Sequence, residues 1–180
     1  MKQPALLIVD MFTLFDFPHA EQLKPGAVRA ARSIARLCRH FRAHGHPVIH
    51  ANDNFANWQM DFKELVRTCL GTEGASSTIA GMLQPEPGDY FILKPKHSAF
   101  LATPLVVLLA KLGVDELVVT GMTAESCVAA TCFDSNAREY RTVVIREAVA
   151  GIGSGKATAL RLLEASKAAK VLRLDSYLAR

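Results

Sequence analysis

The chain has 180 residues, of which 50% are hydrophobic, and this predicts a single domain, residues 1–180, with a sizeable core. Its net charge of +4 comes from scattered residues, including an arginine stripe at residues 29–42 that is typical of a solvated helix face, so we expect no nucleic-acid partner. No stretch of about 18 apolar residues occurs, so we expect no membrane span either.

Short β-branched runs alternate with longer helical patterns along the chain. In chain order, the pattern predicts a strand at 5–9, a helix at 25–44, a strand at 47–51, a helix at 62–70, a strand at 90–93, a helix at 103–112, a strand at 116–120, a helix at 126–138, a strand at 142–145, a helix at 156–169 and a strand at 171–174. Pro25 suits the first turn of the first helix and Gly45 suits its end. Thr103 and Pro104 suit the N-cap and the first position of the third helix.

Alternating strands and helices are typical of a parallel sheet that is covered by helices on both faces. The continuous apolar runs ALLIV and ELVV support this arrangement, because strands buried on both faces carry few polar residues. The sequence therefore predicts a three-layer α/β domain with a parallel sheet. Ligands of such folds bind beyond the carboxyl ends of the strands, so polar residues directly after the strands are the candidates for function.

Polar or reactive residues follow four of the predicted strands. Asp10 follows the first strand, residues 52–54 follow the second, Lys94 follows the third, and Gly121 begins a turn of small residues after the fourth. Cys127 comes after that turn, at the start of a helix. The positive end of a helix stabilises a thiolate, so we expect Cys127 to have a lowered pKa and to act as a nucleophile.

The other three cysteines, Cys38, Cys69 and Cys132, are expected to pack as small hydrophobic residues. The cysteines have no CxxC spacing, which indicates neither a zinc site nor a disulfide framework. The apolar run near the start of the chain is too short for a secretion signal, and we expect a reduced, cytoplasmic setting.

Position alone leaves two roles open for both Asp10 and Lys94. Asp10 is either a structural cap of nearby backbone amides or the base that a thiol nucleophile needs. Lys94 is either a surface lysine or a cation that balances Asp10 and stabilises the thiolate of Cys127.

Three motifs together resemble the isochorismatase-like cysteine hydrolases, a family related to nicotinamidases and N-carbamoylsarcosine amidohydrolase. The motifs are LLIVDM with Asp10, KPKHSAF from Lys94 to Phe100, and GMTAESCVAAT from Gly121 to Thr131. The resemblance covers nearly the whole chain and implies a doubly wound, six-stranded parallel sheet of order 3-2-1-4-5-6. In that order Lys94 lies two strands away from Asp10 and must reach with its long side chain. The resemblance also suggests a homodimer or homotetramer.

The resemblance further implies chemical roles for the motif residues. The catalytic trio would be Asp10, Lys94 and Cys127, and the backbone amides of Thr123 and Cys127 would receive the oxyanion. A cis peptide bond between Met122 and Thr123 would shape the turn that presents them. The implied reaction cleaves a C–N bond, in an amide or carbamoyl group of a small molecule, through a Cys127 thioester. Isochorismatases that cleave a vinyl ether lack this cysteine, so Cys127 favours amide chemistry.

Two aromatic residues depart from the family pattern. Phe12 occupies a position where the family often has glutamine, so we expect a more apolar pocket. Phe55, in the run that begins at Asp53, replaces a histidine that binds metal in nicotinamidases. His50 and His97 do not have ligand spacing to Asp53, so we expect neither a metal nor another cofactor.

Side chains that follow the first three strands are expected to line the substrate pocket: Phe12, Phe15, Asn52, Asp53, Phe55, Trp58 and His97. His97 has three possible roles: a second base for Cys127, a pocket wall or an exposed residue. Trp58 and Phe55 either cover the site or pack within an ordinary loop.

Two other functions compete with hydrolysis. A non-catalytic ligand-binding or assembly module on the same fold is compatible with the departures at Phe12 and Phe55, although the complete catalytic trio argues against it. A redox-active thiol is the weaker alternative, because Cys132 does not lie on the same helix face as Cys127.

We predict that the purified protein holds no stoichiometric zinc or iron, because Phe55 stands at the position of the metal-binding histidine. Elemental analysis of protein purified without an affinity tag measures the metal content directly. About one metal ion per chain, bound by Asp53, would contradict this prediction.

Overall fold

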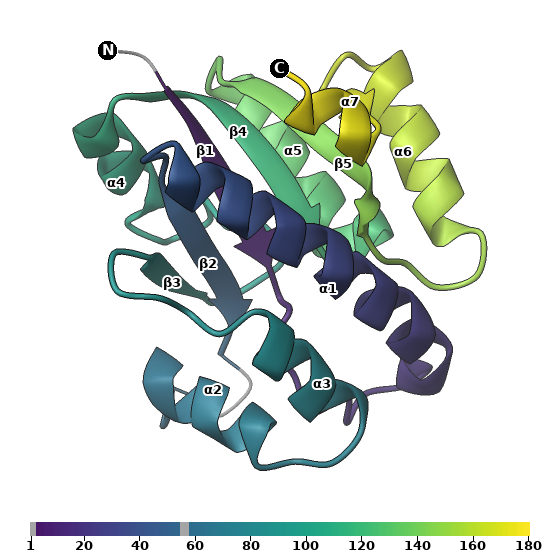
Figure 1. The fold of residues 1–180 in the computed structure, drawn as a ribbon. Helices are drawn as coiled ribbons and strands as arrows, with labels where there is room; N and C mark the ends of the chain where they lie inside the picture. Colours follow the sequence, from purple (N-terminus) through teal and green to yellow (C-terminus); the bar gives the residue numbers. More distant parts are fainter. Residues whose placement is uncertain (1–2, 55–57) are drawn as a thin grey trace.

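A computed structural model of the chain describes residues 3–54 and 58–180, and its centre is one parallel sheet (Figure 1). The six strands have the order β3-β2-β1-β4-β5-β6, which confirms the predicted topology. Their bounds are β1 (Gln3–Val9), β2 (Val48–Asp53), β3 (Tyr90–Lys94), β4 (Val114–Gly121), β5 (Arg141–Val149) and β6 (Lys170–Leu172).

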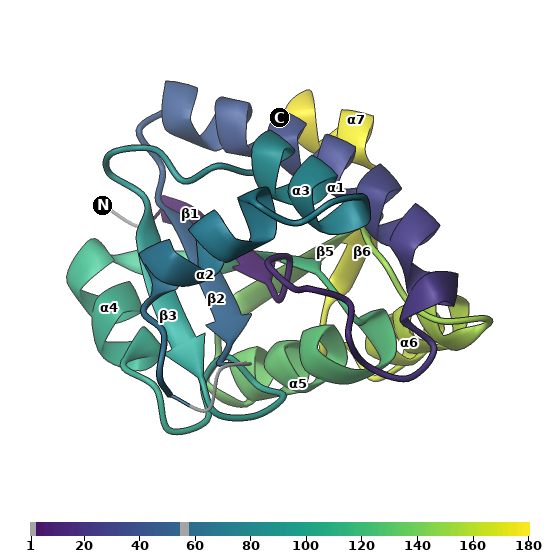
Figure 2. The same ribbon diagram turned by 90° about the horizontal axis from the view of Figure 1, so that it is seen from below.

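Helices cover both faces of this sheet and complete the three layers (Figure 2). One face carries α1 (Ala20–Ala43), α2 (Phe62–Leu70), α3 (Ala75–Met82) and α7 (Leu174–Leu178). The other face carries α4 (Leu105–Leu112), the π-helical turn η1 (Ala124–Val128), α5 (Ala129–Ala137) and α6 (Gly155–Ala165). No helix within the described residues is long and apolar enough to cross a membrane.

Strand β1 lies between two hydrophobic clusters, one on each of its faces. Leu6 and Ile8 pack on the side of α1, whereas Leu7 and Val9 pack on the side of α4 and α5. This alternation follows from the pleat of a strand, which points successive side chains to opposite faces. It explains why β1 consists of uninterrupted apolar residues until it reaches Asp10.

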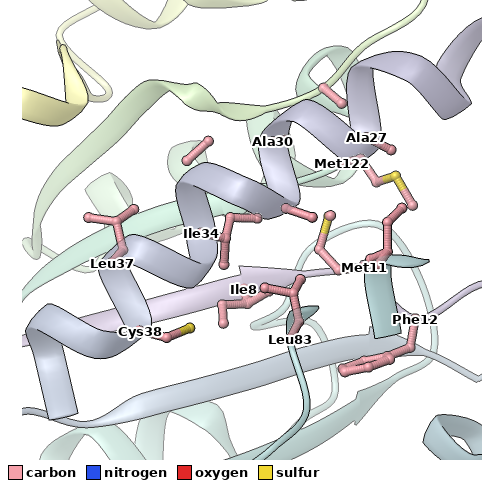
Figure 3. Packing of buried hydrophobic residues seen from close by; sticks show 14 of the residues in the cluster. Ile8, Met11, Phe12, Ala27, Ala30, Ile34, Leu37, Cys38, Leu83 and Met122 are labelled. Carbon is pink, nitrogen blue, oxygen red and sulfur yellow. The ribbon is translucent and has the colours of Figure 1, made fainter. Parts of the chain in front are cut away.

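Helix α1 is the largest helical contribution to the core. Its small residues, among them Ala27 and Ala30, allow a close approach to the sheet, and Ile34 packs above Ile8 of β1 (Figure 3). Methionine side chains from the ends of β1 and β4 fill the space near its first turns, as Figure 3 shows for Met122.

The start of α1 corrects the prediction from Pro25. The helix begins at Ala20, so Pro25 lies inside it and not in its first turn. Pro25 has no N–H to donate to the carbonyl of Glu21, which weakens this part of the helix. Burial of Ala20 and Leu23 in the core stabilises the additional turn and outweighs that loss.

Other boundaries differ by a few residues. Strand β2 continues through Asn52 and Asp53, which were expected to follow it, and Lys94 is the last residue of β3. Helix α6 ends at Ala165, and β6 ends at Leu172 because the next residues turn into α7. The short helices α3 and α7 were not predicted, since α3 is rich in serine, threonine and glycine and α7 has only five residues.

A partly buried ion cluster joins α1 to the turn before β3. Two guanidinium nitrogens of Arg42 donate to the carboxylate of Asp89, and the amide of Glu86 donates to it at 2.9 Å. Nε2 of His50 on β2 lies 3.5 Å from the same carboxylate. Burial alone would raise the pKa of Asp89, but its contacts with His50, Arg42 and the Glu86 amide lower the pKa to about 2.

We predict that Asp89→Asn lowers the free energy of unfolding by roughly 2 kcal/mol at pH 7. A carboxylate with a depressed pKa stabilises the fold above its unfolded pKa, and this contribution is lost as the pH falls toward the folded value. Urea unfolding at pH 7 and at pH 3 measures the difference, which should shrink at pH 3. The exposed Asp16→Asn serves as the control. An equal loss at both pH values would contradict the assignment.

Candidate active site

Three side chains from different strand ends meet at the carboxyl edge of the sheet. Asp10 directly follows β1, Lys94 ends β3, and Cys127 lies in η1 after β4. Nζ of Lys94 is 2.9 Å from Oδ2 of Asp10 and 3.6 Å from Sγ of Cys127. Lys94 therefore reaches across β2, and the structure brings together the trio that the resemblance implied.

Backbone geometry fixes the carboxylate of Asp10. The residue has a φ of 53°, a left-handed conformation that costs free energy and occurs mainly where the surrounding structure holds it. Its amide donates to the carbonyl of Ala51 at 3.0 Å, and its Oδ1 accepts from the amide of Asp53 at 2.7 Å. These bonds make Asp10 a cap of β2 as well as a partner of Lys94, so the structural role left open by the sequence is present, and the role as a base stays a prediction.

The ammonium group of Lys94 is fully buried and surrounded by oxygen atoms. Besides Asp10, it lies 3.5 Å from Oδ2 of Asp53 and donates to the carbonyl of Lys96 at 2.9 Å. Burial alone would lower the pKa of Lys94, but the charge of Asp10, its hydrogen bond with Lys94 and the charge of Asp53 raise the pKa above its ordinary value. Lys94 is therefore a fixed cation and not a snorkelling surface residue.

Burial raises the pKa of Asp10, although the charge of Lys94 and hydrogen bonds from Cys127, Lys94 and the Asp53 amide act in the opposite direction. A carboxylate with a raised pKa binds a proton more strongly than an exposed aspartate does.

The expected lowering of the Cys127 pKa is wrong for this arrangement. Burial and the charge of Asp10 raise the pKa of Cys127 to about 12, and Lys94 offsets only part of this effect. A helix end contributes only about half an elementary charge, whereas Asp10 contributes a full negative charge beside the sulfur atom. The resting thiol is consequently protonated.

The turn from Gly121 to Cys127 has the configuration expected from the resemblance. The peptide bond between Met122 and Thr123 is cis, and Gly121 has a φ of 106°. A Cβ atom at Gly121 would lie 2.0 Å from the carbonyl oxygen of Val9, so only glycine fits where β4 meets the end of β1. Among the described residues, the amide of Thr123 has no hydrogen-bond acceptor, and it is available to a ligand.

Of the residues expected to line a pocket, Asp53 and His97 lie beside the trio. Nδ1 of His97 is 3.8 Å from Sγ of Cys127 and 3.2 Å from Oγ of Ser126. Ser126 and the carbonyl of Lys96 were not identified from the sequence, because a hydroxyl group and a main-chain oxygen carry no specific signal in an isolated sequence.

Phe12 and Phe15 do not line an open pocket. Phe12 is buried in the core, with an edge-to-face contact to Phe62 at a ring distance of 5.5 Å, and Phe15 belongs to the same hydrophobic cluster. The expectation of an apolar substitution in the pocket at Phe12 is therefore wrong, because the residue faces α2 and not the thiol. Asn52 is also buried and exchanges hydrogen bonds with the backbone of Phe12 at 3.0 and 2.9 Å.

Trp58 is 66% exposed, and its amide donates to Asn54. Phe55 lies outside the described residues. Within residues 3–54 and 58–180, no three His, Cys, Asp or Glu side chains gather in an arrangement that could hold a metal ion. The metal content stays a prediction.

Comparison with known proteins agrees with this fold and with these motifs. The sequence pattern of the Isochorismatase domain matches residues 4–176. The isochorismatase family protein YaaI of Bacillus subtilis (strain 168) is 37% identical over 146 residues, which are 81% of this chain and 80% of that protein. Maleamate amidohydrolase of Pseudomonas putida is 31% identical over 156 residues, which are 82% of this chain and 72% of that protein.

Among solved structures, N-carbamoylsarcosine amidase from Thermoplasma acidophilum has a TM-score of 0.71 and 30% sequence identity, and the match covers 97% of this chain and 98% of that chain. The match therefore extends over the whole sheet and the edge at which the three side chains meet. Because the family pattern spans nearly all of the sequence and named amidohydrolases share its fold, the chain belongs to the isochorismatase family of hydrolases.

Proposed function

We propose that this protein hydrolyses a C–N bond, in an amide or carbamoyl group of a small molecule, through a thioester at Cys127. The single observation that carries the proposal is the contact of Lys94 with both Asp10 and Cys127, at 2.9 and 3.6 Å. A buried carboxylate, a fixed ammonium group and a partly buried thiol at one point are the components of nucleophilic acyl transfer.

In the first step, Asp10 accepts the proton of Cys127 as the sulfur atom attacks the carbonyl carbon. Lys94 stabilises the thiolate as it develops, and its own proton stays in place. Because the resting thiol is protonated, proton transfer and attack occur together in the presence of substrate, and free thiolate does not accumulate.

The amides of Thr123 and Cys127 receive the negative charge that develops on the carbonyl oxygen. One such donor typically lowers the barrier by about 3 kcal/mol. When the tetrahedral adduct collapses, the C–N bond breaks and the leaving nitrogen takes the proton from Asp10. Water then attacks the thioester, Asp10 accepts a proton from the water, and the thiol leaves with that proton.

The relatives indicate the substrate class. Two relatives are named maleamate amidohydrolase and N-carbamoylsarcosine amidase, and these names specify the hydrolysis of an amide and of a carbamoyl compound. An assembly of two or four copies and a cytoplasmic location stay predictions.

We predict that Cys127→Ala abolishes ammonia release from an amide panel that begins with maleamate and N-carbamoylsarcosine. Asp10→Asn should lower the rate at least 100-fold, within the range of roughly 10²–10⁴ that general base catalysis contributes. Cys132→Ala, which removes a buried thiol from the next helix, is the control and should retain activity. Turnover by Cys127→Ala at the wild-type rate would exclude the thioester mechanism.

We predict that iodoacetamide labels Cys127 before the other three cysteines and that its rate rises continuously from pH 7 to pH 10. Cys38, Cys69 and Cys132 are buried, and burial raises the pKa of each of their thiols. The reactive thiolate of Cys127 increases with pH because its pKa is about 12. Peptide mapping after brief labelling measures both effects. Equal early labelling of Cys38, or a plateau below pH 8, would contradict the assignment.

A further inference from the structure

The glycine-rich segment GIGSG, residues 151–155, follows β5 and has no role in the proposed chemistry. Two backbone hydrogen bonds join the residue just before this segment to the turn that carries Cys127. The amide of Ala124 donates to the carbonyl of Ala150 at 2.7 Å, and the amide of Ala150 donates to the carbonyl of Gly121 at 3.0 Å. The turn is therefore attached to the β5–α6 connection on the side away from Lys94.

Glu125 adds a side-chain contact to this attachment. Its Oε1 accepts from the amide of Ile152 at 2.9 Å. A Cβ atom at Gly155 would lie 2.7 Å from Cδ and 2.9 Å from Oε1 of Glu125, and a Cβ atom at Gly151 would lie 2.3 Å from Oε2. The carboxylate thus occupies the space that a side chain at residue 155 would fill, and at residue 151 it shares that space with the backbone nitrogen of Lys156, 2.9 Å from such a Cβ.

The charge of Glu125 also fits its location. Gly155 is the first residue of α6, a helix of eleven residues, and the N-cap Ser154 makes no side-chain capping bond. The start of a helix attracts negative charge. The carboxylate therefore lies where a backbone donor, two side-chain-free positions and a helix dipole all favour it.

We propose that Glu125 is a positioning residue for the Cys127 turn, which deepens the proposed function and rests on it. Glu125 lies between Thr123 and Cys127 in the chain, so a bond that fixes it also fixes the two amides that receive the oxyanion. Sγ of Cys127 itself lies 3.6 Å from Nζ of Lys94. Glu125 acts through the backbone, and its carboxylate contacts the β5–α6 connection.

Two variants remove the contact by different means. Glu125→Ala deletes the carboxylate, whereas Gly155→Ala displaces it, because the three nearest atoms to a Cβ at residue 155 all belong to Glu125. In the double variant, Glu125→Ala with Gly155→Ala, the Glu125 atoms that would conflict with the new Cβ at residue 155 are absent. If both changes act on one contact, their effects will not add. Gly81→Ala, at a helical glycine with open space around it, is the matched control.

The experiment measures acylation of Cys127 by p-nitrophenyl acetate, from the release of nitrophenol and the mass of the labelled peptide. We expect Glu125→Ala and Gly155→Ala each to slow acylation about tenfold, because small displacements of reacting groups have effects of this order or larger. The double variant should be no slower than either single variant. Glu125→Gln keeps the acceptor oxygen, so its acylation rate should stay within about threefold of the wild-type rate.

Alkylation by iodoacetamide needs no oxyanion site and separates positioning from loss of structure. We expect all these variants to alkylate Cys127 at rates near that of the wild type, with melting temperatures that remain well above the assay temperature. Three results would each overturn the inference. Glu125→Ala could acylate Cys127 at the wild-type rate, the effects could add in the double variant, or Glu125→Gln could be as slow as Glu125→Ala. If Cys127→Ala instead retained amide turnover, the proposed function itself would fail.

Discussion

The buried ion pair between Asp10 and Lys94 is the interaction on which the site depends. Its atoms are 2.9 Å apart, and removing one partner of such a pair leaves an uncompensated charge that costs about 3–5 kcal/mol. Asp10 follows β1 and Lys94 ends β3, so the pair forms only if β2 lies between them with Asp53 opposite Lys94. The geometry of the site therefore requires this strand order.

The thiol completes the site from the other half of the sheet. Cys127 follows β4, on the far side of β1 from β2 and β3, so the groups meet where the strand order reverses. The same Asp10 that pairs with Lys94 raises the pKa of the Cys127 thiol. The resting thiol is protonated and lies beside its proposed base and a cation. We therefore expect Cys127 to lose its proton when a substrate is bound, and not to rest as a free thiolate.

Several features could be predicted from the sequence, and the exceptions have physical reasons. Strands such as β1 and the helix α2 were evident from apolar runs and turn residues, while the sheet order and the trio came from the family resemblance. The pKa of Cys127 could not be predicted, because it depends on burial and on the charge of Asp10, 117 residues earlier in the chain. Phe12 follows a strand end, yet its backbone turns it into the core against Phe62, which a linear pattern does not reveal.

The most direct measurement of the central claim is the mass of the enzyme during turnover of the amide that it hydrolyses fastest. A rapid acid quench followed by peptide mapping should find the acyl group of the substrate on the Cys127 peptide, and hydroxylamine should remove it as expected for a thioester. The thioester mechanism would be contradicted if the enzyme turned over at full rate with no acyl adduct on Cys127 at any quench time, and if Cys127→Ala formed product equally fast.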